Sequence, residues 1–319
     1  MTKIDREDIQ IIARHSNWSA ESIDDVLQKE IYSNEASWHK FLRLFFISLG
    51  IGFTTAGIIF FFAYNWADLH KFIKIGLIES LIIVLTLIVS FSKINLDIKN
   101  ILLTGASILV GVLFAVFGQI YQTGANAYDF FLGWTLCITI WVVISNFPPL
   151  WLVFIALINT TIVLYAQQVA HSWSNVFLAT LLFVINILFL IFFLFGKKLS
   201  SDLKSPNWFT NLLALAAVTC STIGITTGIF DESHPFLLVL IIITIILYGI
   251  GIMYGLKEKS GFYLSIIPFS IIIIISAFLL EVSDDAPMFF FVSLFIIGSI
   301  TLVIKNLINL QKKWTNQSI

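Results

Sequence analysis

The chain has 319 residues, of which 58% are hydrophobic, 15% aromatic and only 12% charged. A soluble domain is about 45–50% apolar and about 25% charged, so this composition excludes an ordinary soluble enzyme, a disordered chain and a fibrous protein. The net charge of −1 at pH 7 gives no electrostatic reason to bind nucleic acid. The composition, with a mean hydropathy of +0.96, predicts an all-α, polytopic bundle of transmembrane helices.

Residues 1–42 precede the apolar spans. We predict that they form a short helical head in the cytoplasm. Ser19 is a candidate N-cap, and Glu21, Asp24 and Asp25 follow it where the helix dipole favours acids. We expect no cleaved signal peptide, because no apolar run lies within this segment. Two interpretations of the head stay open: a cap packed on the inner face of the bundle, or a docking site for a cytoplasmic partner.

Ten apolar runs follow, and each approaches the roughly 20 residues that a helix needs to cross the hydrocarbon core. Polar segments separate them. The expected spans are residues 43–64, 72–92, 100–118, 128–145, 149–167, 174–195, 208–230, 236–256, 261–280 and 288–308. Only Asn146-Phe147-Pro148-Pro149 divides the fourth span from the fifth. The alternative is therefore eight spans with a re-entrant hairpin at that point.

The distribution of charge supports ten spans with both termini in the cytoplasm. Lys and Arg accumulate in cytoplasmic loops, and with the N-terminus inside, every Lys and Arg except Lys71 and Lys74 falls on the inner side. The loops on the outer side carry acids instead. We divide the chain into the head, a first four-span unit at residues 43–145, a six-span unit at 146–308 and a cytoplasmic tail at 309–319.

Small residues indicate which helix faces are in contact. Lipid does not drive helices together by the hydrophobic effect, so Gly and Ala spaced four apart mark close packing. Such pairs are Gly224 and Gly228 in the seventh span and Gly251 and Gly255 in the eighth. The sixth and ninth spans are dominated by Ile, Leu and Phe, and we expect them to face lipid.

A few polar residues lie at membrane depth. Glu79 is the one ionisable residue well inside an expected span, about 10 Å from the outer end of the second helix at 1.5 Å per residue. A charged residue at a helix centre costs about 2.5–3.5 kcal/mol on insertion scales, so Glu79 is a functional candidate that faces protein or water. A protonated or hydrogen-bonded structural glutamate is the alternative. Asn159 and Asn186 are expected to join helices through amide hydrogen bonds.

A second polar cluster, Gly-Gln-Ile-Tyr-Gln-Thr-Gly at residues 118–124 and its continuation to residue 129, follows the third span. With the first outer loop and Glu79 it predicts an outward-facing polar vestibule, because irregular backbone at membrane depth survives only beside protein or water. The candidate vestibule residues are Asn65, Trp66, Asp68, Glu79, Gln119, Tyr121, Gln122 and Asp129. An interfacial aromatic belt with ordinary loop polarity is the alternative.

Catalytic and cofactor motifs are missing from the sequence. We find no nucleophile elbow, P-loop, HExxH or paired-Asp motif. An intramembrane enzyme is therefore the least favoured class, and we name no catalytic residue and no cofactor. His70, His171 and His234 lie near acids in outer loops, but they lack ligand spacing, so no metal site is expected.

The order of these motifs resembles a known family. After the helical head, the first span ends in Phe61-Phe62-Ala63-Tyr64-Asn65-Trp66, and the Gly-Gln-Ile-Tyr-Gln-Thr-Gly segment leads to Gly133-Trp134. Over about residues 5–150 this resembles the bacterial membrane proteins with domain of unknown function 2157. The resemblance implies an integral protein of the bacterial cytoplasmic (inner) membrane. The family has no settled activity, so the resemblance assigns no catalytic residue.

Two functions remain as hypotheses. The first is a transporter or small-ligand-binding protein in the lipid bilayer, whose outer vestibule takes a small polar solute or a proton coupled to Glu79. The alternative is a membrane sensor or scaffold whose head, residues 1–42, docks a cytoplasmic protein.

Overall fold

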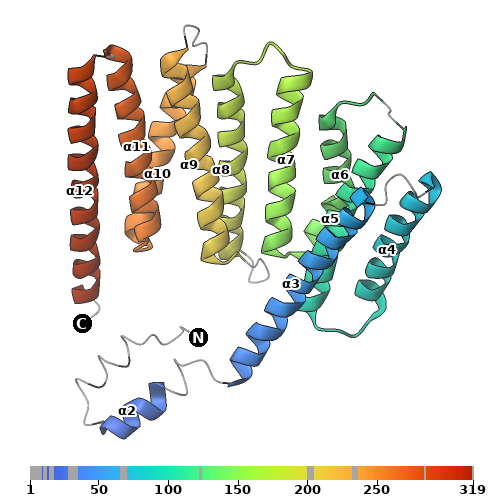
Figure 1. Cartoon of the computed structure of the whole chain (residues 1–319). Helices are drawn as coiled ribbons and strands as arrows, with labels where there is room; N and C mark the ends of the chain where they lie inside the picture. The colour runs from blue at the N-terminus through green and yellow to red at the C-terminus, as the bar shows by residue number, and fades with distance from the viewer. Residues whose placement is uncertain are drawn as a thin grey trace. The chain divides into compact units, whose positions relative to one another are not determined.

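The computed structural model describes residues 9, 13, 18–27, 35–64, 70–121, 124–199, 205–231, 236–283 and 285–317. In these ranges the chain is all-helical (Figure 1). The helices are α2 (Ala20–Val26), α3 (Glu35–Tyr64), α4 (Lys71–Phe91), α5 (Leu96–Tyr121), α6 (Ala127–Ser145), α7 (Pro148–Gln168), α8 (Asn175–Leu199), α9 (Asn207–Phe230), α10 (Leu237–Lys257), α11 (Gly261–Val282) and α12 (Ala286–Gln317).

Ten of the described helices, α3 to α12, are long and apolar enough to cross a membrane. They confirm the all-α fold and the expected ten spans, so the chain is a multi-pass protein whose surroundings are a lipid bilayer. The fourth and fifth spans are separate helices, α6 of 19 residues and α7 of 21, and each is long and apolar enough to cross a membrane, as the ten-span alternative requires. Asn146 ends α6 in a left-handed conformation with φ of 45°, and Pro148 and Pro149 start α7 where no backbone N–H is needed.

The short helix α2 lies in the described part of the head, and it begins as expected. The Oγ of Ser19 accepts a hydrogen bond from the backbone N of Ser22 at 3.2 Å, which confirms Ser19 as the N-cap. Most of residues 1–17 and all of 28–34 lie outside the described ranges. The head as a docking site therefore stays a prediction.

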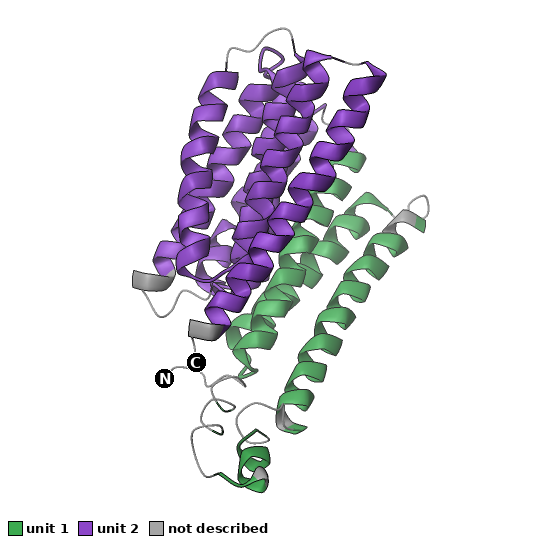
Figure 2. Cartoon of the chain, turned by 90° about the vertical axis from the view of Figure 1, so that its left-hand side faces the viewer, with its two compact units in different colours: residues 1–120, 319 green, residues 121–318 purple. Residues whose placement is uncertain are grey.

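Contacts divide the chain into two compact units, residues 1–120 (unit 1) and residues 121–318 (unit 2), which Figure 2 shows in green and purple. The expected boundary of a four-span unit at residue 145 stays a prediction. In unit 1, Ile78 of α4 and Val116 of α5 are buried against each other and against Ile58 of α3. A Cβ at Gly105 of α5 would come within 2.7 Å of the Ile51 side chain, so α3 and α5 lie close.

Unit 2 is arranged around α9, which contacts α7, α8, α10 and α11. A Cβ at Gly224 would lie 2.6 Å from the Cβ of Ala179 on α8, so the two helices meet at van der Waals distance only because this position is glycine. Gly228 is equally crowded by α8 and α10, and Gly251 and Gly255 of α10 are crowded by α11. These contacts confirm the small-residue faces of the seventh and eighth spans.

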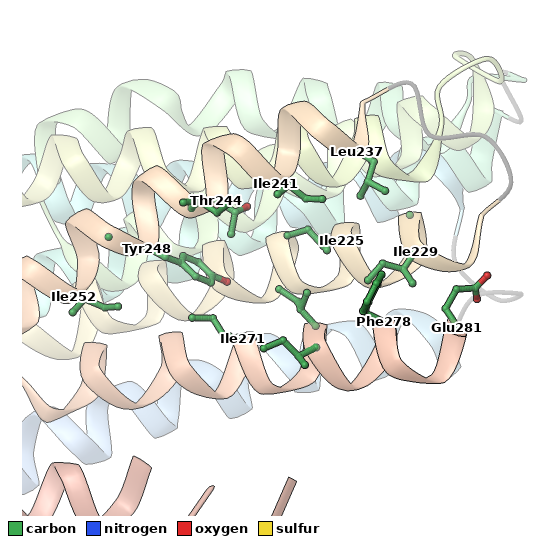
Figure 3. A pocket seen from close by; sticks show the side chains of 15 residues that line it. Ile225, Ile229, Leu237, Ile241, Thr244, Tyr248, Ile252, Ile271, Phe278 and Glu281 are labelled. Atoms are coloured by element: carbon green, nitrogen blue, oxygen red, sulfur yellow. The ribbon is translucent and has the colours of Figure 1, made fainter. Parts of the chain in front are cut away.

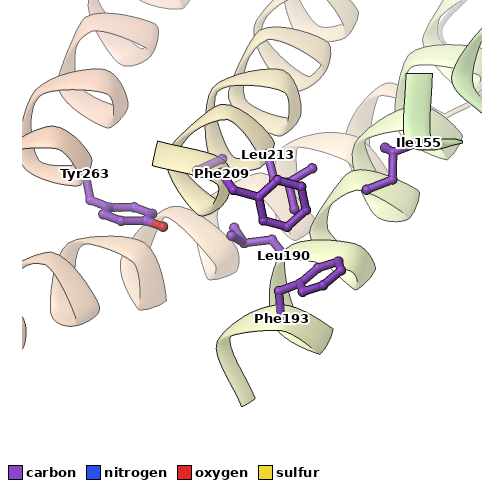
Figure 4. Close-up of a cluster of buried hydrophobic side chains, with 7 residues drawn as sticks. Ile155, Leu190, Phe193, Phe209, Leu213 and Tyr263 are labelled. Atoms are coloured by element: carbon purple, nitrogen blue, oxygen red, sulfur yellow. The ribbon is translucent and has the colours of Figure 1, made fainter. Parts of the chain in front are cut away.

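The expectation that the sixth and ninth spans, α8 and α11, face lipid is wrong. In the apolar, membrane-spanning stretch of each of these two helices, 39% of the residues are buried inside the protein, against 6% in the corresponding stretch of α12. Phe183 and Phe193 of α8 are fully buried. Figure 4 shows Phe193 in a cluster with Phe209 of α9 and Tyr263 of α11. The physical reason is that large apolar side chains pack against protein as readily as against lipid. They therefore do not indicate whether a helix faces lipid or other helices.

Asn159 of α7 and Asn186 of α8 join their helices as expected. Each side-chain amide donates to the carbonyl oxygen of the other, at 3.2 and 3.0 Å. The Asn186 amide also donates to the backbone oxygen of Leu182 at 2.8 Å. Both amide hydrogens of Asn186 are therefore used within the helix pair.

Candidate functional site

The structure describes four of the eight expected vestibule residues. Asn65, Trp66, Asp68 and Gln122 lie outside the described ranges. Glu79 on α4 and Gln119 on α5 are exposed. The vestibule therefore stays a prediction.

The other two described vestibule candidates are Tyr121, which is exposed at the end of α5, and Asp129, which lies in the first turn of α6. The Oδ2 of Asp129 accepts a hydrogen bond from the backbone N of Asn126 at 3.1 Å. This bond closes the start of α6, as a carboxylate at the third helical position does in a capping box. Asp129 thus has a local structural role.

A different feature, a cavity of about 750 Å³, lies in unit 2 between α9, α10 and α11 (Figure 3). Ligand pockets typically measure about 300–1,000 Å³ and are mostly apolar with a few placed polar groups. The described lining residues are mostly Ile, Leu and Phe: Ile225, Gly228, Ile229, Leu237, Ile241, Thr244, Ile245, Tyr248, Gly249, Ile252, Ile271, Ile274, Ile275, Phe278 and Glu281. Its size and chemistry are those of a site for an apolar molecule.

The helix contacts explain where this space opens. Towards its C-terminal end α10 is held tightly to α11, because Gly251 and Gly255 admit the side chains of Ile267 and Leu264. Two residues before Gly251, a Cβ added to Gly249, which lines the cavity, would meet nothing within 4 Å. The two helices are thus in contact at one end of α10, and beyond that contact the space between them is open.

A chain of hydroxyl groups crosses the three helices beside the cavity. The oxygen of Tyr248 lies 2.8 Å from that of Ser221 and 2.6 Å from that of Ser270. The Ser270 oxygen lies 2.6 Å from that of Thr222, which donates to the backbone oxygen of Val218 at 2.6 Å. The Ser221 hydroxyl also donates to the backbone oxygen of Val218, at 2.9 Å. The Tyr248 hydroxyl, which lines the cavity, therefore has two hydrogen-bond partners within the protein, Ser221 and Ser270.

Thr244 is the exception among the polar groups of the lining. Helical threonines usually donate to the carbonyl four residues earlier, as Thr180 and Thr301 do, both at 2.7 Å. Thr244 lies on the cavity wall and is only 4% exposed, yet its Oγ1 has no hydrogen-bond partner among the described groups. An unsatisfied buried hydroxyl costs free energy. A hydrogen-bonding group of a bound molecule would remove that cost.

The sequence patterns did not indicate this candidate site, because its polar residues Thr244 and Tyr248 carry neither a charge nor an amide group. The available signal was weak: Thr244 and Tyr248 lie four residues apart on one face of a span that is otherwise almost all Ile, Leu and Gly. Among the described residues, no group of three or more His, Cys, Asp or Glu side chains could hold a metal ion.

The comparison with known proteins finds a match in the N-terminal part of the chain, not in the helices of the cavity. Residues 19–151 match the family model DUF2157, described as a predicted membrane protein, which confirms the resemblance that the sequence motifs indicate. No curated protein and no solved structure matches the chain. The matched segment runs from the N-cap of α2 into α7 and ends before the helices of the cavity. The chain is thus a multi-pass integral membrane protein, and its residues 19–151 are similar to the DUF2157 family.

Proposed function

We propose that this protein binds a small lipophilic molecule within the membrane, in the cavity between α9, α10 and α11. The observation that carries the proposal is the buried Thr244 hydroxyl, which lines a cavity of about 750 Å³ without a partner. An empty apolar cavity is explained by imperfect packing alone. A buried hydroxyl left without a partner on its wall is a recognition group, because a bound molecule supplies the missing hydrogen bond.

The chemistry of the lining favours a lipophilic ligand over the polar solute that the sequence led us to expect. Glu281, at the end of α11, is the one charged side chain among the described lining residues. A strongly polar solute would lose its hydration without compensating hydrogen bonds in such a space. The cavity therefore gives no support to transport of a polar solute. That hypothesis depends on the predicted vestibule alone.

We place both termini in the cytoplasm of a bacterial cell, with the protein in its cytoplasmic membrane. The proposal rests on the ten spans, on the distribution of Lys and Arg, and on the similarity of residues 19–151 to the DUF2157 family. In this orientation the Glu281 end of the cavity faces the outer leaflet.

Photoaffinity labelling of the full-length protein in phosphatidylcholine nanodiscs tests the ligand site. The probe is a dodecanol that carries a diazirine on its chain, and labelled peptides are identified by mass spectrometry. We expect labels on peptides of α9, α10 and α11 that unlabelled dodecanol displaces.

The matched variants are Gly249→Phe and Gly298→Phe. An added Cβ meets nothing within 4 Å at either position, so neither substitution disturbs packing at its first carbon. Gly249 lines the cavity, whereas Gly298 lies on an exposed part of α12. We expect Gly249→Phe to lose the displaceable label and Gly298→Phe to keep it. Equal labelling of the two variants would refute binding in the cavity.

A further inference from the structure

Building on the proposed function, we infer the chemical class of the ligand: a neutral, lipid-like molecule of the bilayer, with one hydrocarbon chain and one hydroxyl or carbonyl group that pairs with Thr244. Three features of the cavity lead to this class: its charge, its length and opening, and the buried Thr244 hydroxyl without a partner on its wall.

The charge of the lining excludes an anion. No Lys, Arg or His is among the described lining residues, and the one charged side chain, Glu281, is a carboxylate. A phosphate or fatty-acid carboxylate inside the cavity would be buried without a counter-charge, which is strongly unfavourable. The polar group of the ligand is therefore uncharged.

The length of the cavity fits a hydrocarbon chain from one leaflet. The lining runs from Ile271 to Glu281 on α11 and from Leu237 to Ile252 on α10, rises of about 15 and about 22 Å at 1.5 Å per residue. The hydrocarbon core of a bilayer is about 30 Å thick, so the cavity extends across at least half of it. One extended lipid chain spans that half.

The cavity also opens sideways. Ile245 of α10, and Ile275 and Phe278 of α11, line it, yet their side chains are 67%, 39% and 57% exposed. Because these helices cross the membrane, that exposed surface is in contact with lipid. A molecule already dissolved in the bilayer can therefore enter between α10 and α11 without passing through water.

Apart from the Glu281 carboxylate at the end of the cavity, the described lining residues offer a ligand one unpaired hydrogen-bonding side chain. The Tyr248 hydroxyl is already paired with Ser221 and Ser270. Thr244, one turn earlier on the same face of α10, has its hydroxyl without a partner among the described groups. A ligand with one oxygen-bearing group satisfies this site, and a pure hydrocarbon leaves it unsatisfied.

Competition against the diazirine dodecanol probe tests this inference. The competitors are dodecanol and dodecane, which share one chain length and differ only in the hydroxyl, each expressed as its mole fraction in the bilayer. In the unmodified protein we expect dodecanol to compete about two- to tenfold better than dodecane, which corresponds to one hydrogen bond. Thr244→Ser retains a hydroxyl and keeps that preference. Thr244→Val has nearly the same shape and loses it.

The outcomes separate the two proposals. If the probe labels no peptide of α9, α10 or α11 in the unmodified protein, the proposed function itself is wrong. If labelling occurs but dodecane competes as well as dodecanol, or if Thr244→Val keeps the preference, the cavity binds apolar molecules and the inferred class is wrong. Melting curves of the variants show that each is folded before labels are compared.

Discussion

Substitution of Gly224 by alanine tests the packing that positions the cavity. Gly224 lies on α9 where α8 approaches most closely, and the new Cβ would lie 2.6 Å from the Cβ of Ala179. It would also lie 2.7 Å from Cδ2 of Leu240 on α10. The Leu240 side chain can rotate away, but the Cβ of Ala179 is fixed to its backbone. The contact is therefore relieved only if the helices move apart.

The magnitude follows from these distances. Ordinary carbon–carbon contacts lie at about 3.5–4.0 Å, so α8 and α9 must separate by about 1 Å at Gly224. Overpacking of this kind typically costs about 1–3 kcal/mol. Replacing a helical glycine with alanine returns about 1 kcal/mol of helix propensity. We expect Gly224→Ala to lower the free energy of unfolding by about 1–2 kcal/mol.

Unfolding by SDS in mixed micelles, followed by tryptophan fluorescence, measures the effect. Gly298→Ala is the matched control, because its Cβ meets nothing within 4 Å and it should be neutral or slightly stabilising. Ala179→Gly removes the methyl group that Gly224→Ala would meet. In the double variant we expect a favourable coupling of about 1 kcal/mol between the two sites. A Gly224→Ala protein as stable as the Gly298→Ala control, or a double variant without coupling, would refute this account of the α8–α9 contact.

Two further predictions concern the amide pair and the vestibule. Asn186→Leu leaves the side-chain amide of Asn159 without its partner and should cost about 1–2 kcal/mol in the same unfolding assay, whereas Asn159→Leu/Asn186→Leu should recover most of the loss. A double variant as unstable as the single one would contradict this. If the polar vestibule exists, Glu79→Cys in a protein without its native cysteines should react rapidly with a membrane-impermeant maleimide applied outside intact cells. No reaction at position 79, with Asp68→Cys reacting normally, would end the vestibule hypothesis.

The positions of the spans could be predicted because a bilayer imposes a strong contrast between apolar membrane-spanning segments and polar loops. Polar segments have to lie outside the hydrocarbon, so each expected span lies almost entirely within an observed helix, as 208–230 does within α9. The division at Asn146 to Pro149 was also readable in principle. Two prolines are compatible with the first turn of α7 and incompatible with the middle of one continuous helix.

Which helices lie inside the protein could be predicted only where small residues marked the contact. Gly224 has meaning in the sequence because a close approach of backbones needs it. Phe183 has no such meaning, since its side chain is equally stable in lipid and in the core of unit 2. The apolar α8 therefore looked like a lipid-facing helix, although Phe183 is fully buried.

The candidate site lies beyond sequence reasoning for a related reason. A threonine in an apolar helix ordinarily donates its hydroxyl hydrogen bond to a backbone carbonyl of its own helix, as Thr180 does. The residues next to Thr244 in the sequence do not distinguish it from that case. The difference comes from the three-dimensional packing, which opens a space beside Gly249 and leaves the Thr244 hydroxyl on its wall without a partner. Inside a membrane the informative polar residue is thus not the most polar one. The informative residue is the one whose hydrogen bond the protein itself leaves unmade. Only there does a lipophilic ligand form a hydrogen bond that the surrounding lipid does not offer.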